Sequence, residues 1–133
     1  YFEETVNIHH RPVSSMPFDN ELYDGIFCHA LIHLLNAEER KKLIYDCYNQ
    51  LKTNGYMVFV AISKDDFRYE QGHEISKDTF ETWPGLTLFF FDSESIKASF
   101  GDYGLISAEI MNEPKLQSGN KPVQRFWYIV CKK

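Results

Sequence analysis

The side chains of this sequence that could do chemistry include two histidines placed four residues apart. His29 and His33 have the spacing at which two imidazoles on a helix can share a metal ion. They straddle the junction between a predicted strand and the turn that leads into a helix, with no acidic residue or third histidine nearby, so we expect no metal site. An imidazole also titrates near neutral pH, which makes His33 a candidate general base. A structural role for His33 is the favoured alternative.

A second group of candidates lies in residues 63–85, a segment too long for an ordinary connection and therefore expected to be a substrate-side lid or partly disordered. Its carboxylates could bind a cation or a substrate amine, although loop carboxylates are more often only solvated: Asp65, Asp66, Asp78 and Glu81. Its large rings could wall a substrate pocket: Tyr69, Phe80 and Trp83.

Composition narrows the class of protein. The 133 residues suffice for one domain, and 44% of them are hydrophobic, enough for a core. The net charge of −5 and the lack of a Lys/Arg cluster argue against a nucleic-acid partner. No signal peptide or long apolar run is present, so we expect a cytoplasmic protein that does not enter a membrane.

The cysteines are read as structural. Cys28, Cys47 and Cys131 are far apart and form no CxxC pair. We expect buried free thiols in a reducing compartment, with disulfides as the alternative.

The elements that would position these side chains are read from hydrophobic patterns. Residues 5–10 alternate as a short strand, and residues 25–30 form an apolar run typical of a strand buried on both faces. Asn36 and Glu39 form a capping box that starts a helix over 36–51, which Gly55 stops. A buried strand follows at 56–62. This order predicts a βαβ unit with a parallel strand pair.

The rest of the chain alternates between strands and one helix. Residues 86–91 read as a short strand, and Asp92 is a good N-cap for a helix whose inner face holds Ile96 and Phe100. Residues 105–111 and 125–131 read as two strands joined by a polar loop, which favours an antiparallel pair.

One segment carries a family resemblance. Met16-Pro17-Phe18, followed by Tyr23-Asp24, resembles the class I S-adenosylmethionine-dependent methyltransferases, where an "LPF-x-x-x-x-FD" loop leads into the fourth sheet strand. Residues 51–56 stand where that family writes "L-K-P-G-G". The loop region and the Phe126-Trp127 strand are most similar to the tellurite-resistance or thiopurine type of methyltransferase.

The resemblance implies an α/β fold: a partial Rossmann-like, mostly parallel sheet with an antiparallel C-terminal strand and helices on its faces. It implies S-adenosylmethionine as the cofactor and a small molecule as the methyl acceptor. The cofactor wall would be formed by Pro12, Val13, Ser14, Cys28, His29 and Ala30. His29 would face the cofactor, and residues 63–85 would lie on the acceptor side.

The sequence also departs from the family pattern. It contains neither the glycine-rich turn that follows the first strand nor the acidic residue that binds the ribose hydroxyls. Pro12 occupies a position that is commonly Asp. We therefore expect residues 1–133 to be a truncated methyltransferase domain, running from the third strand onward and inactive alone.

Two functions remain open. An intact protein would transfer methyl groups to a small acceptor. Alternatively, the chain is a non-catalytic methyltransferase-like domain that acts as an oligomeric or partner-binding module. An unpaired edge of the fourth strand would invite a homodimer in either case.

Overall fold

The computed structural model describes residues 8–13, 21–114 and 119–133. Its main sheet has the strand order β1-β2-β7-β6, built from β1 (Tyr23–His29), β2 (Leu51–Ile62), β7 (Gln124–Lys132) and β6 (Leu105–Glu113). β1 and β2 are parallel, whereas β7 is antiparallel to both β2 and β6. The α/β class and the antiparallel C-terminal strand are confirmed, because β7 alone runs against β1, β2 and β6 in a mixed sheet.

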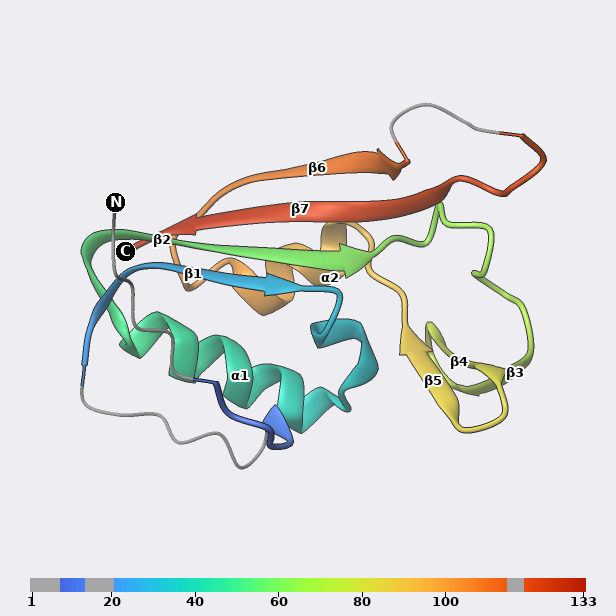
Figure 1. The fold of residues 1–133 in the computed structure, drawn as a ribbon, viewed down its shortest axis with the longest axis horizontal. Helices are drawn as coiled ribbons and strands as arrows, with labels where there is room; N and C mark the ends of the chain where they lie inside the picture. Colours follow the sequence, from blue (N-terminus) through green and yellow to red (C-terminus); the bar gives the residue numbers. More distant parts are fainter. Residues whose placement is uncertain (1–7, 14–20, 115–118) are drawn as a thin grey trace.

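Two helices cover one face of the main sheet (Figure 1). They are α1 (Ala37–Asn49) and α2 (Ser93–Phe100), and a short 3-10 helix, η2 (Ile32–Leu34), follows β1. Both predicted N-caps are confirmed, because Asn36 and Asp92 each form a capping box. The main core lies between this helical layer and the sheet, where Phe59 and Phe100 place their ring centroids 5.1 Å apart.

A second, three-stranded antiparallel sheet lies beyond the carboxyl ends of β1 and β2 (Figure 1). It consists of β3 (His73–Ser76), β4 (Thr79–Trp83) and β5 (Leu86–Phe89). A second hydrophobic cluster joins this small sheet to the other face of the main sheet and contains Val60, Ile62, Phe80, Leu88, Phe90 and Phe126. Residues 63–85 are therefore ordered into turns and two strands.

The first helix ends earlier than the sequence predicts. α1 stops at Asn49, and β2 already begins at Leu51. Gly55 therefore does not terminate the helix. It lies where the chain approaches β1, and an added Cβ would be 2.9 Å from the carbonyl oxygen of Lys52 and 3.0 Å from that of Asp24.

Two strand predictions need correction. Ile8, His9 and His10 belong to no strand, and Ile8 is 87% exposed, so its apolar side chain has no sheet surface to cover it. Residues 5–7 lie outside the described residues. The strand at 25–30 exists as β1, but it is not buried on both faces: only Cys28 is buried, and Phe27 is 64% exposed. The physical reason is that the helices cover one face of β1.

The three cysteines are free and buried, as the sequence predicts. Burial raises the pKa of the Cys28 and Cys131 thiols to about 11, and that of Cys47 to about 12. We expect all three thiols of the folded chain to resist an aromatic disulfide reagent at mildly alkaline pH and to react in concentrated guanidinium chloride. Rapid reaction of even one thiol in the folded chain would contradict the packing of the main core.

Candidate functional site

The candidate site lies where β1 and β2 end side by side. A parallel pair brings its carboxyl ends to the same edge, and open α/β sheets bind ligands outside that edge. The chain leaves β1 through Ala30, whose φ of 54° lies in the left-handed region. The Ala30 amide donates to the carbonyl oxygen of Val60 at 2.9 Å, which fixes the turn. A non-glycine residue in this conformation is strained, and such residues cluster at functional sites.

His33 follows this turn and is buried. Its Nδ1 accepts a hydrogen bond from the amide of Ile62 at 3.0 Å, so the neutral ring carries its proton on Nε2. Burial, assisted by the charge of Arg68, lowers the pKa of His33 to about 4 against an opposing effect of Asp66. Near neutral pH the geometry therefore makes His33 a hydrogen-bond donor at Nε2 and a poor general base.

This burial makes stability depend on pH. The pKa of His33 is lower in the folded chain than the value of 6.5 for an exposed imidazole. As pH falls from about 6.5 to about 4, the unfolded chain takes up a proton that the folded chain refuses. We expect a loss on the order of 3 kcal/mol of unfolding free energy over this range.

Urea unfolding of the wild type and of His33→Asn at several pH values measures this loss. The Asn oxygen keeps an acceptor for the Ile62 amide but does not titrate. If the unfolding free energy of His33→Asn falls with pH as much as that of the wild type, the loss comes from groups other than His33.

Asp66 does not behave as the solvated loop carboxylate that its sequence position suggests. Its side chain is fully buried. It accepts hydrogen bonds from Nε and Nη2 of Arg68 at 2.8 and 3.1 Å and from the amides of Arg68 and Arg125 at 3.0 and 2.7 Å. The sequence signal for this role is the Asp-x-Arg spacing of Asp66 and Arg68, shortly after the buried strand β2.

The Asp66–Arg68 pair and His33 meet at one ring. Phe126 is buried, with its centroid 6.1 Å from that of His33, and Cζ of Arg68 lies 5.8 Å from the same ring. The arrangement ties the turn after β1, the turn after β2 and the start of β7 into one unit.

His29 lies on the face of the main sheet opposite the helices. Its side chain is 48% exposed, and its Nε2 lies 3.9 Å from Oε1 of Glu113. That carboxylate also accepts a hydrogen bond from the Tyr128 hydroxyl at 2.6 Å, which raises the pKa of Tyr128. His29 is thus accessible beside a polar group from β6 and β7.

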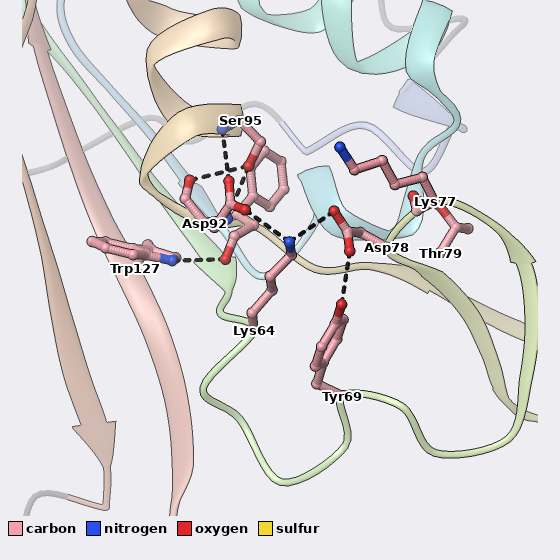
Figure 2. A network of polar contacts seen from close by, with 9 residues as sticks. Lys64, Tyr69, Lys77, Asp78, Thr79, Asp92, Ser95 and Trp127 are labelled. Atoms are coloured by element: carbon pink, nitrogen blue, oxygen red, sulfur yellow. Dashed lines mark hydrogen bonds and ion pairs between the residues drawn. The ribbon is translucent and has the colours of Figure 1, made fainter.

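A charged network fastens the small sheet to the rest of the chain (Figure 2). Nζ of Lys64 lies 2.9 Å from Oδ2 of Asp78, in the β3–β4 turn, and 2.7 Å from Oδ2 of Asp92, the N-cap of α2. The hydroxyl of Tyr69 donates to Asp78 at 2.8 Å. The bond from Lys64 holds the pKa of Asp92 at about 2. Lys64 therefore links three segments that are distant in sequence.

The predicted cofactor residues fall in two places. Cys28, His29 and Ala30 lie together at the end of β1, with Cys28 turned into the main core. Pro12 is exposed and Val13 packs against the main core, and Figure 1 draws the segment 8–13, in dark blue, apart from the end of β1. Ser14 lies outside the described residues.

The predicted substrate residues do not form one wall. The Tyr69 ring packs edge-on against Phe80 and Phe90, with both centroid distances at 5.4 Å. Tyr69 and Phe80 thus belong to the second hydrophobic cluster, whereas Trp83 is 72% exposed at the end of β4. The Tyr69 and Phe80 rings therefore stabilise the small sheet, and a role of these residues beside a substrate stays a prediction.

Two further features concern metals and membranes. Within residues 8–13, 21–114 and 119–133, no three His, Cys, Asp or Glu side chains are grouped so as to hold a metal ion. Neither described helix has the length and apolar character needed to cross a membrane.

Part of the sequence, and the fold, resemble known proteins. Residues 2–59 match the family model described as a methyltransferase domain. No curated protein matches the sequence significantly.

Three solved structures share the fold. An S-adenosylmethionine-dependent methyltransferase from Methanosarcina mazei is 16% identical, with a TM-score of 0.71, over 92% of this chain and 65% of its own. The 1,6-didemethyltoxoflavin-N1-methyltransferase of Burkholderia thailandensis, solved with S-adenosylhomocysteine, is 13% identical, with a TM-score of 0.66, over 92% of this chain and 48% of its own. A possible histamine N-methyltransferase of Thermotoga maritima is 19% identical, with a TM-score of 0.61, over 91% of this chain and 61% of its own. The chain thus has the class I methyltransferase fold and spans less than two thirds of each of these chains.

Proposed function

We propose that this chain, which has the class I methyltransferase fold, forms part of a site that transfers a methyl group from S-adenosylmethionine to a small-molecule acceptor. The observation that carries the proposal is the strained turn at Ala30, at the carboxyl end of a parallel strand pair. The fold match and the methyltransferase-domain match over residues 2–59 support it.

The residues after β1 would form one wall of the cofactor site. Ala30 would present its turn and His29 its exposed imidazole, while Cys28 would contribute backbone only because its side chain faces the core. When bound, S-adenosylmethionine supplies an electrophilic methyl group. Such a transfer depends mostly on positioning and exclusion of water, so no side chain need act as a base. His33 would donate a hydrogen bond from Nε2.

A single wall holds a ligand weakly. The seven glycines of the sequence do not form a glycine-rich turn of the kind that binds phosphates or S-adenosylmethionine. Pro12 has no side-chain acceptor for the amino group of an adenine ring. We therefore expect this chain alone to bind the cofactor product S-adenosylhomocysteine poorly. Pro12, Val13 and Ser14 remain a proposed second wall.

The second candidate function is a non-catalytic, methyltransferase-like binding module. It is favoured by large apolar side chains that remain exposed on the main sheet: Phe27 at 64%, Ile106 at 55% and Tyr56 at 45%. A homodimer would be one way to cover them. The free thiols suit a reducing compartment such as the cytoplasm.

Calorimetric titration with S-adenosylhomocysteine, together with native mass, separates these functions. We expect a folded chain with no measurable isotherm at micromolar ligand and a Kd on the order of 1 mM or weaker. Micromolar binding would contradict the single-wall proposal. A stable dimer that does not bind the ligand at any accessible concentration would favour the non-catalytic module.

A further inference from the structure

A groove of about 360 Å³ lies between η2, the first turns of α1 and the small sheet. His33 borders it, which places the groove next to the turn that leaves β1. Its rim includes Leu34 and Ile75, which are 45% and 55% exposed. This volume falls within the range of small-molecule sites, so the groove has room for a compact ligand with an apolar body.

Arg40 lies in the lining of this groove and is held in a defined position. Its Nη1 donates to the carbonyl oxygen of Leu35 at 2.7 Å. Its Cζ lies 3.8 Å from the centroid of the Phe89 ring, a stacking distance for a guanidinium group. The two contacts fix the group between α1 and β5, so its remaining N–H donors are preorganised.

The charge of Arg40 is not compensated by the part of the chain that the structure describes. The ion pairs there involve His29, Lys42, Lys52, Lys64 and Arg68. The acidic residue in the groove lining is Glu39, and its Oε1 accepts from the Asn36 amide at 3.1 Å as part of the capping box. Burial lowers the pKa of Arg40, which reflects the cost of keeping an unpaired charge away from water.

The lining opposite α1 is polar without being charged. Ser76, Thr79 and Thr87 face the groove from the small sheet. The Thr79 hydroxyl donates to the carbonyl oxygen of Lys77 at 3.2 Å, and those of Ser76 and Thr87 can donate or accept. A half-buried guanidinium, neutral hydroxyl groups and an apolar rim together suit an anion that also carries apolar surface. Arginine is well matched to a carboxylate because its planar donors can bind both oxygens.

We propose that this groove binds a small carboxylic acid with a flat or compact apolar body, whose carboxylate pairs with Arg40. This ligand would be the methyl acceptor, and that part of the inference rests on the proposed function. The anion site itself can be tested without the cofactor. The contrary view is that Arg40 only straps α1 to Phe89, in which case it needs no ligand.

The test is a titration of the chain with benzoate, followed residue by residue by amide chemical shifts in NMR spectra. We expect saturable shifts at the groove, centred on residues 34–40 and 75–79. Benzyl alcohol, which lacks the charge, should cause much smaller shifts. The charge-removing variant Arg40→Gln should weaken benzoate binding by about tenfold or more.

Two further variants make the result specific. Ile75→Glu places a negative charge on the exposed rim and should weaken benzoate binding several-fold without touching the core. Lys41→Gln removes a neighbouring charge that lies outside this groove and should change the affinity by less than about twofold. If Arg40→Gln does not fold, Ile75→Glu still decides the matter.

Several outcomes would overturn the site. They are an absence of saturable shifts, equal shifts with benzyl alcohol, or benzoate binding that a folded Arg40→Gln or Ile75→Glu leaves unchanged. These failures are separable from failure of the proposed function, because benzoate is titrated without the cofactor. Loss of the benzoate site with S-adenosylhomocysteine still bound at the end of β1 would remove only the acceptor assignment.

Discussion

Replacing Asp66 with Ala is expected to lower the unfolding free energy of the chain by about 3–5 kcal/mol. The Asp66 side chain is fully buried and accepts four hydrogen bonds, two of them from the guanidinium of Arg68. Its removal leaves the Arg68 charge without its partner and the Arg125 amide without an acceptor. Urea unfolding monitored by circular dichroism measures the loss.

The same carboxylate adds to the acid sensitivity of the fold. Burial by itself would raise the pKa of Asp66, but the bonds from Arg68 and from the Arg125 amide outweigh it, so its pKa is lowered on folding. Its stabilising effect is therefore complete above the pKa of an unfolded aspartate, about 4, and is lost as pH falls through the lower folded value.

The neighbouring Asp65 provides the control. It is exposed, and Asp65→Ala should change the unfolding free energy by about 0.5 kcal/mol or less. Equal effects of the two substitutions would contradict a buried Asp66. An acid unfolding curve of Asp66→Asn that coincides with the curve of the wild type would also contradict it.

The second large effect is expected from Phe90→Ala, at about 3–5 kcal/mol. Phe90 is fully buried at the centre of the second hydrophobic cluster, and its ring lies edge-on to Tyr69 and Phe80 at 5.4 and 6.1 Å. Truncation removes the apolar contact that joins the small sheet to β2 and β7. The groove beside Arg40 would then lose the wall that the small sheet forms opposite η2.

Hydrogen exchange locates this effect. We expect amides of β3, β4 and β5 to lose protection first, while those of β2 and β7 remain protected by the main core. Phe67→Ala is a matched control, because Phe67 is 48% exposed in the same region. Uniform loss of protection over both sheets would show that the small sheet is not a separately opening unit.

The local signals of the sequence identified most elements of the fold. Asn36 and Asp92 were recognisable as N-caps because both residue types accept from helix amides, and Glu39 completes a capping box with Asn36. Buried strands with apolar runs, such as β2, were equally clear. The end of α1 was misplaced because Gly55 looks like a helix stop, whereas its small size serves a close approach to Asp24.

The features that depend on long-range contacts were not accessible from sequence. Asp66 and Asp65 look alike in the chain, but only Asp66 turns inward to meet the Arg125 amide, 59 residues away. Arg40 likewise reads as an ordinary helix-surface charge, and its half-burial appears only when β5 packs Phe89 against it. Phe27 shows the opposite error: an apolar run predicted burial, yet helices cover only one face of its strand.

The most direct test of the central claim is a residue-resolved NMR titration of this chain with millimolar S-adenosylhomocysteine. We expect weak, saturable shifts of the amides of residues 28–32, at the end of β1, and little change at the C-terminal end of α1, around Asn49. Ala30→Val, which disfavours the left-handed turn, should reduce these shifts. Absence of shifts at residues 28–32, or saturable shifts confined to another surface, would contradict the placement of the cofactor wall.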